Sequence, residues 1–163
     1  MLRFNVTDRG VRKAFRRLER SAGPGGLEPA LRAVARAVRT RIALGFRRGE
    51  SPYGRKWAPP KGRTGQPLRK SGRLQRSIRS RVQGRRAAIG TNLKYARTHQ
   101  FGARIRAKHH PALRFRMGDR WVSKKEVRIP ARPFLPTEGL PEGWARKVVD
   151  VLSRHLQRAI KGG

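Results

Sequence analysis

The chain has 163 residues and carries 42 lysine and arginine residues against nine aspartate and glutamate residues, a formal net charge of +33. This charge destabilises an isolated compact monomer and favours a polyanionic or acidic partner, either nucleic acid or an acidic protein. The absence of cysteine excludes disulfides and thiolate metal sites. No run of about 18 apolar residues is present, so we expect no membrane partner. The first residues lack the apolar region of a signal peptide, so we expect synthesis in the cytoplasm.

Two helices are predicted in the first part of the chain. A short strand at Phe4 and Val6 is expected to precede a helix in which Val11, Phe15 and Leu18 share one face. Glycine and proline at 21–26 end that helix. The second helix has one apolar stripe, formed by Leu27, Leu31, Val34, Val38, Ile42 and Phe46.

Residues 47–70 are rich in glycine, proline and lysine and show no apolar periodicity, which predicts a long loop. Trp57 is expected to pin this loop to the body of the protein, because a free indole would leave a large apolar area in water. A short helical turn containing Leu74 and Ile78 is then expected, followed by a hairpin of strands 79–83 and 86–89.

Residues 89–102 form the least charged long stretch of the sequence. Tyr95 and His99 are four residues apart and would share one face of a short helix, with Phe101 beside them. Gly102 is typical of a residue that ends a helix. We expect this short helix to be buried and to act as a structural hub on which other elements pack.

A second basic region follows at 103–129. Residues 113–117 alternate in polarity, and residues 121–129 offer a return strand, which predicts a basic hairpin. Prolines keep residues 130–136 extended, with Phe134 buried. A last amphipathic helix is expected to begin near Pro141. The predicted fold is therefore α+β: a single domain, 1–163, in which a small antiparallel sheet is flanked by two or three helices, with 47–70 a long loop and 103–129 a basic loop or hairpin insertion.

The sequence contains no pattern typical of catalysis. The nine carboxylates are scattered, and the glycine-rich phosphate loop and the metal-binding helix motif are both missing. His109 and His110 are adjacent, so in a strand they point to opposite faces and cannot bind one metal together. We expect no enzyme activity, no cofactor and no catalytic or metal site. Zinc-finger and RNA-recognition motifs are also missing, which leaves contact with phosphates as the mode of nucleic-acid binding.

Four segments in a fixed order carry a family resemblance: S-P-Y-G-R-K-W-A-P at 51–59, K-S-G-R-L-Q-R-S-I at 70–78, I-G-T-N-L-K-Y-A-R-T-H-Q-F-G at 89–102 and P-A-R-P-F-L at 130–135. Together they resemble the phage virion morphogenesis proteins, the group of the Mu-like G proteins and the P2-like tail completion proteins. The resemblance extends over about residues 27–160. The high positive charge of this chain departs from the family.

The resemblance implies a structural protein of tailed-phage assembly with an α+β fold. Such proteins act in the virion at the head–tail junction or the proximal end of the tail, as neck, tail completion or tail terminator layers. They form homo-oligomeric rings, often hexameric, between the connector and the tail tube. The partners implied are further copies of the chain and the adjacent neck, connector and tail tube proteins. Non-specific contact with phage DNA is a further possibility.

Residue roles follow from this interpretation. The structural hub is predicted to consist of Tyr95, His99, Phe101 and Phe134. The candidate interface is predicted to consist of three apolar anchors and three cations: Tyr53, Trp57, Trp121, Arg104, Arg106 and Lys108. The alternative function is a general nucleic-acid-binding protein that contacts DNA phosphates without sequence specificity.

Overall fold

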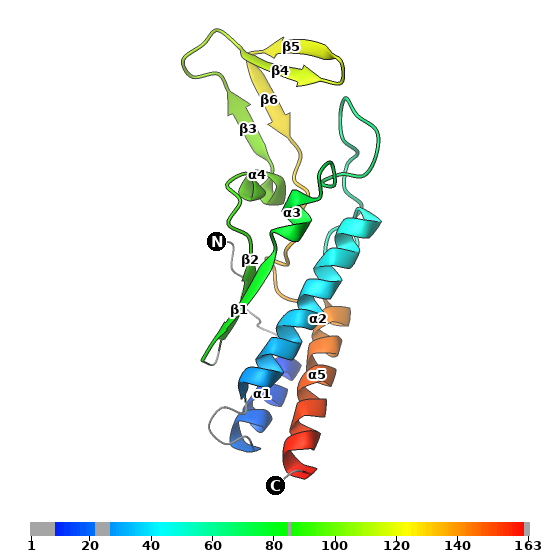
Figure 1. Cartoon of the computed structure of the whole chain (residues 1–163), viewed down its shortest axis with the longest axis vertical. Helices are drawn as coiled ribbons and strands as arrows, with labels where there is room; N and C mark the ends of the chain where they lie inside the picture. The colour runs from blue at the N-terminus through cyan, green and yellow to red at the C-terminus, as the bar shows by residue number, and fades with distance from the viewer. Residues whose placement is uncertain (1–8, 22–26, 85, 162–163) are drawn as a thin grey trace.

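The computed structural model describes residues 9–21, 27–84 and 86–161, and within them the protein has an α+β fold, as predicted. The helices are α1 (Arg9–Ser21), α2 (Leu27–Arg48), α3 (Arg73–Arg76), α4 (Ala96–Phe101) and α5 (Glu142–Lys161). The strands are β1 (Arg79–Gln83), β2 (Arg86–Gly90), β3 (Ala103–Arg106), β4 (Leu113–Met117), β5 (Arg120–Lys124) and β6 (Glu126–Ile129). The long helices occupy one end of an elongated molecule, and β3 to β6 occupy the other end (Figure 1).

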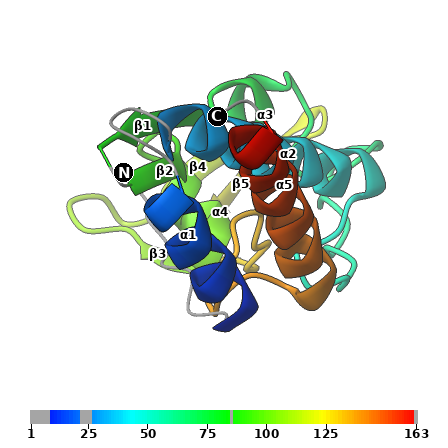
Figure 2. The ribbon, with the colours of Figure 1, turned by 90° about the horizontal axis from the view of Figure 1, so that it is seen from below.

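Of the three long helices, α5 lies in the middle and packs against both α1 and α2 (Figure 2). Each helix buries an apolar stripe at helical spacing, for example Val38 and Ile42 on α2 and Val148 and Leu152 on α5. The predicted second helix is confirmed, and it extends two residues further, to Arg48. Gly49 follows with a φ of 66°, a left-handed conformation that suits glycine at a helix end.

An aromatic cluster links segments that are far apart in the sequence. The ring of Phe46, at the end of α2, lies 5.4 Å from the ring of Trp57 and 5.6 Å from the ring of Phe134. All three side chains are buried. The indole nitrogen of Trp57 also donates a hydrogen bond of 2.9 Å to the carbonyl oxygen of Pro133. Trp57 therefore pins the long loop to the core, as predicted, and Phe134 is buried as predicted.

The strands form three separate antiparallel pairs among the described residues: β1 with β2, β3 with β6 and β4 with β5. The first pair is the predicted hairpin, and it packs against α2. The prediction of one return strand over 121–129 is wrong. That segment divides at Lys125 into β5, which pairs with β4, and β6, which pairs with β3. Each half thus has a different partner strand, a choice made by tertiary contacts rather than by local alternation.

Some predictions fall on residues that the structure does not describe. The predicted strand at Phe4 and Val6 lies outside the described residues, and so does the break at 22–26.

Candidate functional site

The outermost part of the molecule is a two-layered extension that we call the arm, residues 103–129. It consists of the β3–β6 pair, which rises from the body, and the β4–β5 hairpin beyond it (Figure 1). The arm carries nine lysine and arginine residues and two carboxylates, a net charge of +7. It is the predicted basic insertion.

The base of the arm is held by the side chain of Gln100, the most buried residue of α4. Its Oε1 accepts hydrogen bonds of 3.0 Å from the backbone N–H groups of Phe134 and Leu135. Its Nε2 donates a bond of 2.8 Å to the carbonyl oxygen of Leu135. One amide group therefore satisfies three backbone groups of the chain that leaves the arm.

The two ends of the arm lie next to each other. Gly102, with a φ of 75°, ends α4 and starts β3. A Cβ at this position would lie 2.9 Å from the carbonyl oxygen of Ile129 and 3.0 Å from the nitrogen of Ala131, so only glycine allows this close approach. The backbone N–H of Arg132 donates a 2.7 Å bond to the carbonyl oxygen of His99, which closes the base.

The long loop supports the arm at both of its ends. At the base, the buried guanidinium of Arg132 donates hydrogen bonds of 2.8 Å to the oxygen of Ala58 and 3.0 Å to that of Pro59. At the tip, Gly62 lies so close to Met117 that a Cβ on it would be 2.2 Å from the Met117 Cγ. The loop and the arm are thus in contact at both ends.

A groove of about 790 Å³ lies between the loop and the base of the arm, and we call it the arm groove. Its apolar lining is provided mainly by Ala58, Pro59, Pro60, Phe101, Ile129, Pro130 and Ala131. Three cations, Lys61, Arg104 and Arg128, also line it. Phe101 is 53% exposed and adjoins the other apolar residues of this groove, so together they form a contiguous apolar surface.

The charge on the β3–β6 pair is organised by one carboxylate. Glu126 accepts from the Nε atoms of Arg104 at 2.5 Å and Arg106 at 2.8 Å, and Arg128 lies 3.5 Å away. Arg104 stands directly opposite Arg128 in the strand register, an unfavourable pairing that Glu126 offsets. The hydrogen bonds from Arg106 and Arg104 lower the pKa of Glu126 from 4.5 to about 2.

We expect the β3–β6 pair to loosen only in strong acid. Because the folded pKa of Glu126 is lowered, its stabilising contribution is present above the usual pKa of 4.5 and is lost as the pH falls through about 2. In Glu126→Gln the backbone amides of this pair should exchange with solvent faster already at neutral pH, as measured by NMR hydrogen exchange. Glu142→Gln, which alters an exposed ion pair with Arg146 on α5, is the control and should leave the arm unchanged. Unchanged exchange in Glu126→Gln would contradict this role.

The far end of the arm exposes a large aromatic side chain. Trp121 on β5 is 66% exposed, and the guanidinium carbon of Arg114 lies 5.3 Å from its ring centre. Ile105 and Met117 of the arm are each 39% exposed. Aromatic residues, methionine and arginine are enriched in protein interfaces, so this end of the arm has the composition of a docking surface.

The predicted interface residues differ in their exposure and in their contacts within the chain. Trp121, Arg104, Arg106 and Lys108 are exposed on the arm, so all four are available to a partner. Tyr53 is 38% exposed, but its hydroxyl donates to the oxygen of Gly139 at 3.0 Å and accepts from the N–H of Glu138 at 2.9 Å. Tyr53 therefore joins the long loop to the segment before α5.

The assignment of Trp57 to the interface is wrong, because its indole is only 7% exposed. A side chain that packs on Phe46 and donates to Pro133 belongs to the core and is not available to a partner.

The predicted hub is also corrected. Tyr95 is 40% exposed and Phe101 is 53% exposed, so the prediction that both are buried is wrong. His99 is half-buried, and its ring lies 5.8 Å from that of Tyr95. Burial, and then the charge of Arg132, lower the pKa of His99. The residues of α4 that face the core are Ala96 and Gln100, which lie four positions apart.

Two residues central to this site, Gln100 and Arg132, were not predicted. The spacing of Ala96 and Gln100 was a usable signal, because an uncharged amide four residues from an alanine can share the buried face of a helix. No signal in the sequence indicates that Arg132 contacts the loop at Ala58, because these residues are 74 positions apart.

No three histidine, cysteine, aspartate or glutamate side chains gather in the described part of the chain in a way that could hold a metal ion. None of the helices described is both long enough and apolar enough to cross a membrane.

Comparison with known proteins identifies the family. Residues 6–157 match the phage virion morphogenesis family. A curated relative, the Mu-like prophage FluMu G protein 2 of Haemophilus influenzae, is 36% identical over 107 residues. The match covers 66% of this chain and 64% of the relative, so the chain spans somewhat less than two thirds of that protein's length. No solved structure matches the chain. Because the family match extends over nearly the whole chain, the protein belongs to the phage virion morphogenesis family.

Proposed function

We propose that this protein, a structural protein of phage assembly, forms a homo-oligomeric ring in the virion at the head–tail junction or the proximal end of the tail. The ring would join the capsid connector to the tail tube, as a neck, tail completion or tail terminator layer. The observation that carries this proposal is the arm, because its base is held by Gln100 and Arg132 and its tip contacts the long loop, while it exposes apolar side chains and cations.

The arm offers the two surfaces that a ring contact needs. A closed ring uses a heterologous contact, in which two different surfaces of each subunit meet. The exposed Trp121 side chain provides a protruding surface, and the arm groove, which Phe101 lines, provides a concave surface. In the proposed ring, the Trp121 side chain of one subunit enters the arm groove of the next.

Removal of the Trp121 side chain should abolish oligomer formation and leave the stability of the subunit nearly unchanged. Because the indole side chain of Trp121 is largely exposed, Trp121→Ala should change the free energy of unfolding by no more than about 0.5 kcal/mol. An anchor residue at the centre of an interface contributes about 2 kcal/mol or more to binding, so oligomers should be lost. Mass photometry of the purified protein measures the oligomer, and urea unfolding measures the stability. Oligomers that persist in Trp121→Ala would contradict the proposed contact.

The place in the virion is tested in a phage that carries the gene. Without a functional gene, electron micrographs of lysates should show heads and tails that are not joined, and the wild-type gene supplied in trans should restore complete particles. Complete infectious particles in the absence of the protein would exclude a role at the junction.

A second candidate function is binding to DNA phosphates without sequence specificity, which the net charge of +33 favours. Neutralisation of phosphates makes the affinity fall steeply as salt rises. A titration of duplex DNA at several salt concentrations measures this dependence, and a flat response would exclude this function.

A further inference from the structure

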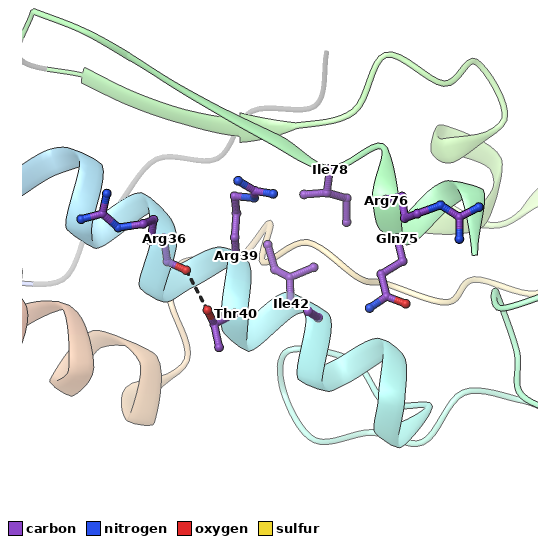
Figure 3. A pocket seen from close by; sticks show the side chains of 8 residues that line it. Arg36, Arg39, Thr40, Ile42, Gln75, Arg76 and Ile78 are labelled. Carbon is purple, nitrogen blue, oxygen red and sulfur yellow. Dashed lines mark hydrogen bonds between the residues drawn. The ribbon is translucent and has the colours of Figure 1, made fainter.

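A second groove, remote from the arm, lies between α2, α3 and the start of β1 (Figure 3). Its volume is about 470 Å³. Three arginines line it: Arg36 and Arg39 from α2 and Arg76 from α3. Ile42 and Ile78 lie between Arg39 and Arg76 and form an apolar floor (Figure 3). We call this the α2–α3 groove.

The positive charge of this groove is not balanced by the residues that the structure describes. None of the ion pairs found among them involves Arg36, Arg39 or Arg76. Arg76 donates only to a neutral acceptor, the carbonyl oxygen of Ser71, at 2.8 Å. The pKa of His155 on α5 is lowered, first by burial and then by the charges of neighbouring arginines that include Arg36. An anion in the groove would relieve this repulsion.

The shape of the groove favours an extended anion over a small ion. The three guanidinium groups are spread along the groove and do not converge on one point (Figure 3). A single phosphate could therefore contact only one of them closely. A chain with negative charges at intervals could contact all three, because an arginine fork binds a carboxylate in a bidentate manner.

The lining of the groove distinguishes between protein and nucleic acid. Its lining residues include no aromatic side chain, so it offers no platform on which bases could stack. Its apolar floor gives nothing to a phosphate backbone, whereas it can bury the aliphatic side chains of a peptide. A second copy of this chain is a poor source of the anion, because six of its nine carboxylates are already in ion pairs within the chain: Glu28, Glu50, Asp119, Glu126, Glu142 and Asp150.

We propose that the α2–α3 groove binds an extended acidic segment of another protein, with carboxylates on Arg36, Arg39 and Arg76 and aliphatic side chains on Ile42 and Ile78. The proposal is independent of the ring, because it requires only a partner with such a segment. Loss of the ring would leave it standing, and its own failure would leave the ring proposal unaffected.

The test uses a fluorescent synthetic peptide of about eight residues in which pairs of glutamates alternate with pairs of leucines, so that an extended chain presents both residue types on each face. An extended chain of this length spans about 25 Å. Fluorescence anisotropy measures its affinity for the full chain and for Arg36→Gln/Arg39→Gln. The control is Arg12→Gln/Arg17→Gln, which removes the same charge from exposed positions of α1. The groove variant should bind about tenfold more weakly than the wild type, and the control should bind within about threefold of it.

Two further measurements separate the groove from general charge attraction. A peptide with glycine in place of each leucine should bind more weakly than the leucine peptide, because it leaves the apolar floor uncovered. Arg36→Lys/Arg39→Lys keeps the charge but removes the bidentate fork, so its affinity should lie between those of the wild type and the glutamine variant. The fold of each variant is checked separately. Circular dichroism melting curves of all variants provide this check.

Four results would overturn the proposal. Equal losses in the groove variant and the control would mean that net charge alone attracts the peptide. Equal affinity for the leucine and glycine peptides would exclude the apolar floor. A duplex DNA whose affinity falls only in the groove variant, with peptide binding unchanged, would make the groove a phosphate site. Self-association that depends on Arg36 and Arg39, measured by sedimentation, would make the partner a second copy.

Discussion

Gln100→Met should lower the free energy of unfolding by about 3–5 kcal/mol, although methionine has a similar volume and is apolar. The substitution leaves two backbone N–H groups and one carbonyl oxygen, on Phe134 and Leu135, without a partner in the core. Each buried polar group left unpaired costs about 1–3 kcal/mol. The loss is a large fraction of the stability of a typical domain, so the melting temperature should fall by about 10 °C.

Equilibrium unfolding in urea, followed by circular dichroism, measures this effect. The matched control is Gln157→Met on the exposed face of α5, which should change the stability by no more than about 0.5 kcal/mol. A Gln100→Met protein as stable as the control would mean that water or a shifted backbone replaces the three hydrogen bonds.

Trp57→Ala should destabilise the protein by about 3–5 kcal/mol, the usual cost of removing a large buried aromatic side chain. The indole packs on Phe46 and donates to Pro133, so its loss opens a cavity and detaches the long loop from the segment that leaves the arm. Trp57→Phe keeps an aromatic ring but removes the N–H donor, and it should cost about 1–2 kcal/mol.

Trp121→Ala is the control for this prediction, because it removes the same side chain type from an exposed position. Urea unfolding of all three variants by circular dichroism gives the comparison independently of tryptophan fluorescence. Similar losses for Trp57→Ala and Trp121→Ala would contradict the distinction between a core and a surface tryptophan.

The periodic elements could be predicted from the sequence because their signals are local. The apolar stripe from Leu27 to Phe46 repeats at helical spacing over several turns, and the helix forms as predicted. The β1–β2 hairpin has a glycine at its turn and short flanking strands, and it also forms as predicted.

The burial of α4 could not be predicted from residue type. Tyr95 and Phe101 are the large aromatic residues of this stretch, which suggested that they face the core. The helix spans only Ala96 to Phe101, and its orientation places Ala96 and Gln100 inward instead. In a helix this short, the rotation of the helix decides burial more than the size of each side chain.

The division of 121–129 into two strands could not be predicted either. No glycine or proline interrupts this segment, so the sequence carries no local signal for a break at Lys125. β5 pairs with the nearby β4, whereas β6 pairs with β3, which lies about twenty positions earlier in the sequence (Ala103 with Ile129, Arg106 with Glu126). The site also depends on distant contacts, because Arg132 and Ala58 meet only in the folded protein.

The closeness of the two ends of the arm has a consequence for evolution and for engineering. Ala103 pairs with Ile129, and Arg132 donates to His99, so the chain leaves the body and returns to it at almost the same point. The length and sequence between these positions can then change without moving the helices. Exchange of residues 104–128 for those of another family member would give a chimera with the same body and a different docking preference, so that the choice of neighbour can diverge independently of the scaffold.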